Sequence, residues 1–361
     1  MTKTLVNLAL QGGGAHGAFT WGALDRFLEE DSFEIEGITA TSAGAMNAAA
    51  LKQGWLTGGN EGAREALSDF WLRVAGLDGW AADAVMDWLR LFSPSPSVTS
   101  RALESHPAVV GAEMMTRVFS PYQFNPTNYH PLRTVVEEML DYERVCAVDG
   151  PKLYVAATNV RSGKARIFSG KGIDTDAILA SACLPTLYQA IEIYDPETGR
   201  DEPYWDGGYT GNPALFPLFY DTEACDIIIV HINPLHREDA PHTAQDILNR
   251  VNEISFNASL LRELRGIHFV NRLIDEGAIA TGKMKRNRLH SVSDDALMTQ
   301  LGIATKMTPN KALLLQLRDA GRAAMSAFLE DHRDDIGKRS SVDLPAMFGT
   351  DPLPSLGDAS A

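Results

Sequence analysis

The amino-acid sequence predicts an α/β protein in which helices cover both faces of a central sheet. Short apolar segments typical of buried strands alternate along the chain with segments whose apolar residues recur every three or four positions. The first strand runs directly into three glycines and a helix, and the second runs into a serine and a helix. The chain has 361 residues, which is enough for one large domain or two and for a sizeable core.

The composition is that of a globular protein and excludes several functional classes. Apolar residues make up 45% and charged residues 22% of the chain, which excludes disordered, collagenous and membrane-embedded proteins. The net charge of −15, from 32 basic and 47 acidic residues, argues against a nucleic-acid partner, whose phosphates need clustered Lys and Arg. Three cysteines cannot form an even disulfide framework, and no apolar run is long enough for a signal peptide or a membrane span. We therefore expect a cytoplasmic protein.

The first part of the chain supplies the beginning of the sheet. In chain order, the apolar pattern predicts a strand at 5–10, a helix at 15–30, a strand at 37–41 and helices at 43–51 and 65–74. The segment 78–130 differs, because a tryptophan-rich stretch is followed there by scattered prolines. We treat it as a candidate helical cap over a binding groove, the alternative being a peripheral helix with buried aromatic side chains.

The rest of the chain supplies further strands and one long helix. Strands are expected at 153–158, 165–168, 191–194 and 227–232. Apolar residues at helical spacing predict an amphipathic helix over 243–276. Residues 1–335 would then form one domain, and the Pro-, Ser- and Asp-rich residues 336–361 a disordered tail.

A local basic patch stands out on this acidic protein. It consists of Lys283, Lys285, Arg286 and Arg288. Such a cluster is either a solvated loop or a contact for anionic lipid head groups at a membrane surface.

Three interpretations apply to the glycine loop at 11–17 (QGGGAHG). Gly12, Gly14 and Gly17 fit the GxGxxG fingerprint of dinucleotide-binding proteins, but the second strand ends at 40–42 (ATS) without the carboxylate that holds a ribose. The loop is otherwise a tight turn that needs the conformational freedom of glycine. The third interpretation is an anion cradle, in which bare backbone N–H groups at a helix N-terminus hold a negative oxygen.

Ser42 lies where the second strand meets the second helix, in the sequence ATSAG. A nucleophile elbow has this form, because small neighbours such as Ala43 and Gly44 allow a sharp turn that exposes the serine hydroxyl. Ala40 replaces the first glycine of the usual GxSxG pattern. The alternative for Ser42 is an ordinary helix N-cap. In a parallel sheet the serine and the glycine loop would both lie at the carboxyl ends of strands, where α/β folds bind ligands.

A serine hydroxyl needs a base before it can act as a nucleophile. His231, at the end of the strand IIIVHI, is the best histidine, although a strand histidine is often structural. Asp206 precedes Gly207 and Gly208, a sequence that is also typical of a turn. A carboxylate in a partly dry site nevertheless gains basicity, because desolvation raises its pKa.

The ordered set GGGAHG, TSAG and DGG resembles the patatin-like phospholipase family. Segments such as KLYVAATNVRSGKARIFSG and ILASACLPTLYQAIEI extend the resemblance over most of residues 5–290. The resemblance implies a three-layer sandwich with a mostly parallel, mixed sheet, and a Ser–Asp dyad that works without histidine. Carried over to this chain, Ser42 resembles the nucleophile and Asp206 the base. The glycines that resemble the oxyanion-hole backbone are Gly12, Gly13 and Gly14.

Two positions depart from the family pattern. One is Ala40, and the other is His16, which stands before Gly17 where many relatives have Arg or Lys, so that a fixed charge becomes titratable. The resemblance implies a hydrolase that cleaves carboxylic esters of lipids through an acyl-enzyme, without metal or other cofactor. Its implied partners are a lipid or other ester substrate and, peripherally, a membrane surface. A catalytically weak lipid-binding or regulatory protein and a nucleotide-binding enzyme stay open as alternatives.

Overall fold

Eight strands form one mixed sheet in the part of the chain that the structure, a computed structural model, describes: residues 3–76, 100, 111, 115–116, 118–280 and 282–348. The strands are β1 (Thr4–Leu10), β2 (Phe33–Thr41), β3 (Lys152–Asn159), β4 (Ala165–Ser169), β5 (Ile191–Asp195), β6 (Arg200–Asp206), β7 (Asp226–Val230) and β8 (Arg288–Val292). Their order is β5-β6-β3-β2-β1-β7-β8, with β4 also paired to β3. Five neighbouring strands are parallel to one another: β3, β2, β1, β7 and β8. The pairs β3–β4, β3–β6 and β5–β6 are antiparallel.

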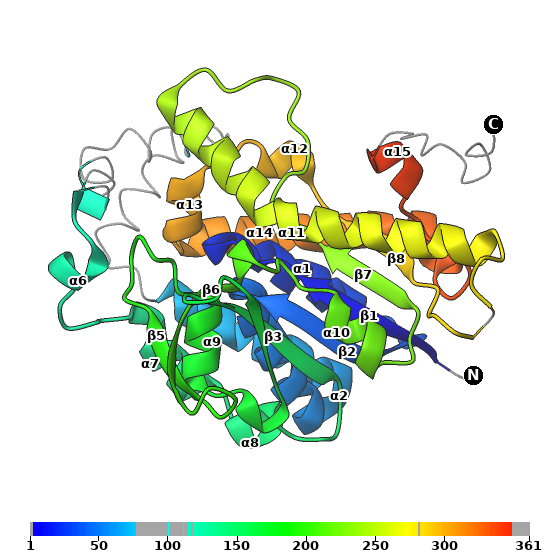
Figure 1. The fold of residues 1–361 in the computed structure, drawn as a ribbon, viewed down its shortest axis with the longest axis horizontal. Coiled ribbons are helices and arrows are strands. Elements are labelled where there is room, and N and C mark those ends of the chain that lie inside the picture. Colours follow the sequence, from blue (N-terminus) through cyan, green and yellow to red (C-terminus); the bar gives the residue numbers. More distant parts are fainter. Residues whose placement is uncertain are drawn as a thin grey trace, which may run out of the picture.

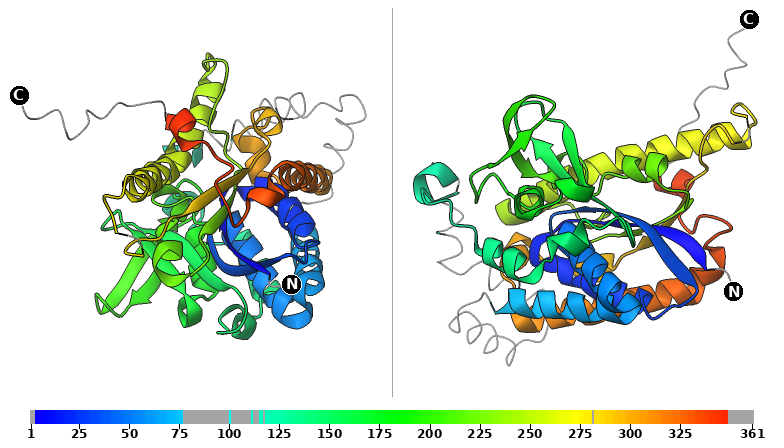
Figure 2. Two further views of the ribbon diagram at one scale, coloured as in Figure 1. Left: turned by 90° about the vertical axis from the view of Figure 1, so that its right-hand side faces the viewer. Right: turned by 90° about the horizontal axis from the view of Figure 1, so that it is seen from below.

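Helices cover both faces of this sheet. They are α1 (Gly17–Phe27), α2 (Ala43–Ala75), α6 (Pro121–Phe124), α7 (Pro131–Met139), α8 (Tyr142–Val145), α9 (Thr175–Ser181), α10 (Phe216–Asp221), α11 (Ala244–Asp275), α12 (Asp295–Met298), α13 (Ile303–Met307), α14 (Lys311–His332) and α15 (Leu344–Phe348). Figures 1 and 2 show α1, α2 and α14 on one face and α10 and α11 on the other. The predicted α/β class, with a central sheet flanked by helices, is confirmed.

The strand β7 shows why the centre of the sheet reads as a continuous apolar run. Ile228 and Val230 pack into the core under α1 and α14, whereas Ile227 and Ile229 pack into a second core under α10 and α11. A parallel strand covered on both faces needs apolar residues at every position. The interior therefore consists of two apolar layers separated by the sheet.

The helices α1 and α14 approach each other through two glycines. A Cβ on Gly22 would overlap the backbone carbonyl of Arg318, and a Cβ on Gly321 would overlap that of Phe19. Each helix thus presents a glycine to the backbone of the other. This close contact brings α14 against the sheet, beside the helix that follows the glycine loop.

Some elements differ from the sequence-based expectation. The helices expected at 43–51 and 65–74 belong to one element, α2, which is kinked at Gly58 and Gly59. The strands β6 and β8 were not expected, because their sequences are largely polar. None of the described helices is long and apolar enough to cross a bilayer.

The first residues of the expected disordered tail at 336–361 are ordered and include α15. Residues 336–348 are packed on the domain: Gly337 N–H donates to Asp226, Ser341 N–H donates to the carbonyl of Leu289, and Leu344 is buried. Most of the expected cap at 78–130, including its tryptophans, lies outside the described residues, as does the chain from 349 onward.

Candidate active site

The glycine loop and the serine turn meet at the carboxyl ends of two neighbouring strands. β1 and β2 are parallel, and Leu10 is paired with Ala40 at their ends. A Cβ on Gly12 would lie 2.6 Å from the Cβ of Ser42, so only glycine fits at that position. The sheet register therefore brings together the glycine loop and the serine turn.

Ser42 has an unusual backbone conformation. Its φ is 55° and its ψ is −124°, a region that non-glycine residues rarely adopt and that costs on the order of 1–3 kcal/mol. Its N–H donates a 2.8 Å hydrogen bond to Ser181 Oγ, which in turn donates to the carbonyl of Ala156 at 2.6 Å. The side chain does not cap α2. The N-cap interpretation therefore does not account for this residue.

The small residues around Ser42 are required by packing. A Cβ on Gly44 would overlap the carbonyl of Leu10, and a Cβ on Gly17 would lie 2.7 Å from the Cβ of Ala43. These contacts let the first turns of α1 and α2 come together. Ala40 is fully buried in the core, so its methyl group does not line the cavity next to Ser42.

Asp206 lies beside Ser42 although the two residues are far apart in sequence. It ends β6, which pairs with β3, and its side chain is 1% exposed. The carboxylate accepts a hydrogen bond from Gly208 N–H at 2.7 Å and interacts with the Ser42 side chain. Burial raises the pKa of Asp206 to about 7, and these two interactions offset part of this effect. A Cβ on Gly207 or Gly208 would overlap neighbouring atoms, so the DGG sequence reflects close packing.

The three glycines of the loop do not have equivalent N–H groups. Gly12 N–H donates to Asn212 Oδ1 at 2.7 Å, so it is already used. Gly13 and Gly14 line the cavity with Ser42, and neither N–H has a hydrogen-bond partner among the described residues. The expectation that all three N–H groups face an oxyanion therefore fails at Gly12.

A buried polar network holds the glycine loop in place. Gln11 Oε1 accepts from Ile232 N–H at 2.9 Å and from Asn233 N–H at 3.0 Å, and Gln11 Nε2 donates to Asn257 Oδ1 at 3.0 Å. Asn233 Nδ2 donates to the carbonyl of Gly12 at 2.9 Å. Sequence reasoning did not single out these amides of Gln11, Asn233 and Asn257, or the hydroxyl of Ser181, as site groups. Only the Asn-Pro turn at Asn212 offered a local signal.

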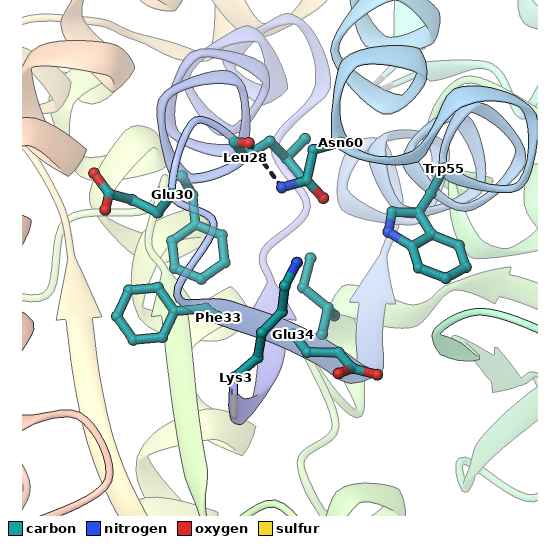
Figure 3. Close-up of a pocket in the computed structure, with 9 residues that line it drawn as sticks. Lys3, Leu28, Glu30, Phe33, Glu34, Trp55 and Asn60 are labelled. Atoms are coloured by element: carbon teal, nitrogen blue, oxygen red, sulfur yellow. Dashed lines mark hydrogen bonds between the residues drawn. The ribbon is translucent and has the colours of Figure 1, made fainter. Parts of the chain in front are cut away.

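Ser42 and Asp206 open onto a cavity of about 280 Å³. Its wall is mostly apolar, with side chains from α2, α7, α11 and α13 that include Met46, Phe70, Val74, Leu132, Phe256 and Ile303. A second cavity, of about 210 Å³, lies at the amino ends of β1 and β2 (Figure 3). Its labelled charged side chains are Lys3, Glu30 and Glu34, and its described lining contains no serine. Of these two cavities, only the apolar one is lined by both a serine and a buried carboxylate.

Neither histidine considered at the sequence level interacts with Ser42. His16 is 1% exposed, and its Nε2 is 2.8 Å from Thr305 Oγ1. Burial and, secondarily, the charge of Lys306 hold the pKa of His16 well below its ordinary value. The expected titratable charge is therefore wrong, because the ring is neutral at neutral pH. Burial likewise lowers the pKa of His231 to about 4, and this residue does not line the cavity.

The expected basic patch is largely engaged within the protein. Lys285 Nζ donates to the carbonyls of Leu218 and Thr222. Arg286 pairs with Asp275 at 2.9 Å, and Arg288 pairs with Asp226 at 2.7 Å. These groups also lie near the amino end of β8, the end of the sheet opposite Ser42.

Among the described residues, no group of three or more His, Cys, Asp or Glu side chains is arranged to hold a metal ion.

Comparison with known proteins identifies the family. A search of curated proteins gave no match. Among solved structures, VipD from Legionella pneumophila is similar with 14% sequence identity and a TM-score of 0.33, over 89% of this chain and 67% of that one. Because the TM-score is this low, we draw no conclusion from the similarity to VipD. The sequence profile described as patatin-like phospholipase matches residues 8–219, more than half of the chain, and that range contains the glycine loop, Ser42 and Asp206. The chain therefore belongs to the patatin-like phospholipase family.

Proposed function

We propose that this protein is a serine acyl hydrolase that cleaves carboxylic esters of lipids. The observation that carries the proposal is that Ser42 and Asp206 line one cavity, where the Ser42 side chain interacts with a buried carboxylate whose pKa is raised to about 7. A base is most effective when its pKa lies near the working pH. The membership of the chain in the patatin-like phospholipase family and the apolar cavity wall support a lipid as the substrate class.

The proposed reaction has two steps. Asp206 takes the proton of the Ser42 hydroxyl as Ser42 Oγ attacks the ester carbonyl, and the alcohol leaves with that proton to form an acyl-enzyme. A water molecule then attacks the acyl carbon, again with Asp206 as base, and Ser42 recovers its proton as the carboxylic acid leaves. The N–H groups of Gly13 and Gly14 are the proposed donors to the oxyanion in both steps, because they line the cavity without other partners.

The backbone at Ser42 supports catalysis over passive lipid binding. A strained conformation persists only where the surroundings enforce it, and here Ser181 and the small residues at the start of α2 do so. A binding protein would need neither the strain nor a serine paired with an acid whose pKa is raised.

Covalent labelling and ester hydrolysis test the proposal together. Wild type is expected to react with a fluorophosphonate probe and to hydrolyse short-chain lipid esters. Ser42→Ala and Asp206→Asn are expected to lose nearly all activity, because residues that act as a unit lose about as much singly as together. The matched controls are Ser162→Ala and Asp201→Asn, both exposed, which should behave as wild type.

Two outcomes would contradict the proposal. Unlabelled, inactive wild type would favour the lipid-binding or regulatory alternative. Loss of activity in His231→Ala with full activity in Asp206→Asn would replace the dyad by a histidine base. Circular dichroism of each variant separates loss of chemistry from loss of fold.

A further inference from the structure

A lysine from α13 lines the cavity that contains Ser42 and Asp206. Lys306 is half-buried, and its Nζ donates a 2.8 Å hydrogen bond to Asn233 Oδ1. The backbone carbonyl of Lys306 occupies the space that a Cβ on Gly14 would need. The lysine therefore lies directly beside the glycine loop, in the wall of the same cavity as the serine.

No carboxylate in the described part of the chain forms an ion pair with Lys306. The acid that acts on it electrostatically, Glu253 on α11, is held instead by Arg237 at 2.5 Å and by Arg250 at 3.1 Å. The ammonium group thus has a neutral amide, that of Asn233, as its hydrogen-bond partner within the same described residues. Its positive charge is left without a counterion.

This arrangement is electrostatically incomplete. An ammonium group has three N–H donors, and a charge removed from water needs a compensating partner. Burial is the main cause that lowers the pKa of Lys306 to about 8. The charge of Glu253 raises this pKa and that of Arg237 lowers it, and both effects are smaller than that of burial. At neutral pH the group is largely protonated, so a residue of the cavity lining carries a positive charge and has two further donors.

We propose that Lys306 makes the site selective for esters that carry a negative charge, by pairing its ammonium group with a carboxylate or phosphate of the bound substrate. The apolar wall then holds the hydrocarbon part, and Lys306 holds the anionic part beside the glycine loop. This inference rests on the proposed hydrolase function of Ser42 and Asp206. It adds a substrate class and a specificity-determining residue to that function.

Two matched pairs of esters test the charge and its source. The first pair is the p-nitrophenyl ester of glutaric acid, which has a free carboxylate on the acyl side, and the same ester with that carboxylate methylated. The second pair is monohexanoylglycerol phosphate, with an anion on the alcohol side, and monohexanoylglycerol. The measured quantity is the ratio of kcat/KM for the charged ester to that for the neutral ester, in which any general loss of activity cancels.

We expect this ratio to exceed one for wild type in at least one pair, and the pair that responds identifies the anion recognised. Lys306→Gln keeps a hydrogen-bonding side chain but removes the charge, and should lower the ratio by about tenfold or more, since hydrogen bonds to charged groups are among the stronger ones. Lys306→Arg should keep the ratio above one. Lys311→Met, at an exposed lysine that begins α14, is the matched control and should leave the ratio at the wild-type value.

The contrary results are distinct from one another. Equal losses on charged and neutral esters in Lys306→Gln would leave the ratio unchanged, and would mean that Lys306 only holds Asn233 and the glycine loop in position. A wild-type ratio of one or less in both pairs would also overturn the inference. In both cases hydrolysis of the neutral esters upholds the proposed function. If wild type hydrolysed none of the four esters, the proposed function would fail and this inference with it.

Discussion

Burial shifts the ionisable residues around the cavity towards their neutral forms. The pKa of Asp206 rises to about 7, that of Lys306 falls to about 8, and those of His16 and His231 fall below the neutral range. The common cause is the low polarity of the surroundings, which disfavours charge of either sign. Near neutral pH, Asp206 and Lys306 therefore change charge while the two histidines stay neutral.

The first prediction concerns the pH dependence of hydrolysis. A base acts in its unprotonated form, so kcat/KM for a neutral ester should rise with pH and level off above an apparent pKa of about 7, that of Asp206. Initial rates measured from about pH 5 to pH 9 would show this, with Asp201→Asn as control. A profile that stays level down to about pH 5 would assign the base to a group with an ordinary carboxyl pKa.

The second prediction concerns Ser181, which acts through Ser42. Ser181→Ala removes the acceptor of the Ser42 N–H and leaves that buried group unpaired, at a cost of about 1–3 kcal/mol. We expect kcat to fall more than KM rises, because the serine turn loses its support while the cavity wall is unchanged. Urea unfolding and steady-state kinetics measure both effects. Ser181→Thr, which keeps the hydroxyl, should restore much of kcat, and equal kcat in all three proteins would remove Ser181 from the site.

Sequence reasoning singled out the proposed dyad, but not the residues that hold it in position. Ser42 and Asp206 stand in local patterns that have chemical meaning, and the sheet brings them together. Ser181 and Asn212 reach Ser42 and Gly12 across 139 and 200 residues of chain, and Lys306 belongs to a short helix without a motif. Contacts between residues so far apart depend on how the whole chain folds, so no local sequence pattern predicts them.

The elements of the core were predictable to the extent that they are apolar. β1, β2, β3 and β7 are buried on both faces and appear as apolar runs, so sequence alone located them. β6 reads RDEPYWD and β8 reads RLHSV, because both carry charged residues that are satisfied by tertiary contacts. In β6, for example, Glu202 is 2% exposed and accepts from Arg200 and Asn159.

The third prediction concerns the contact of α1 with α14. Gly321→Ala should lower the free energy of unfolding by about 1–3 kcal/mol, because the new Cβ meets the carbonyl of Phe19 and forces the helices apart. This would outweigh the gain of roughly 1 kcal/mol that alanine brings to a helix. Gly266→Ala in α11, where a Cβ meets nothing within 4 Å, is the control and should be stabilising. Urea denaturation of the two variants should therefore give shifts of opposite sign.

The whole molecule separates the proposed active site from an ion-pair cluster at the other end of the sheet. Ser42 and the glycine loop follow the carboxyl ends of β2 and β1, whereas Asp226 begins β7 at the amino end. Arg288, His290 and Gly337 all donate to Asp226, which ties β8 and the C-terminal segment to the sheet. Although burial raises it, these bonds lower the pKa of Asp226 to about 2.

The fourth prediction concerns stability in acid. A carboxylate whose pKa is lowered on folding stabilises the protein above its unfolded pKa, and this contribution is lost as the pH falls through its folded pKa. For Asp226 that window runs from its ordinary value of 3.8 down to about 2. Asp226→Asn should lower the free energy of unfolding at neutral pH by about 1–3 kcal/mol, since it leaves the half-buried Arg288 without its charged partner. Thermal unfolding should also show a smaller loss of Tm in acid for the variant than for wild type, and parallel curves would contradict this role.

The burial of Asp206 acts on folding in the opposite sense to that of Asp226. The folded protein holds this proton more tightly than the unfolded chain, so folding stability declines as the pH rises from 3.8 to about 7. Asp206→Asn should accordingly have a higher Tm than wild type at about pH 8 and a similar Tm at about pH 4, and a lower Tm at the higher pH would contradict this.

The two buried carboxylates together make the folded protein most stable at about pH 4, because the Asp226 contribution is lost below that pH and the Asp206 penalty grows above it, up to about pH 7. The proposed activity develops at higher pH, once Asp206 is ionised. An alkaline shift that increases turnover would thus shorten the lifetime of the folded protein on heating. Selection for heat resistance at this site would work against selection for rate.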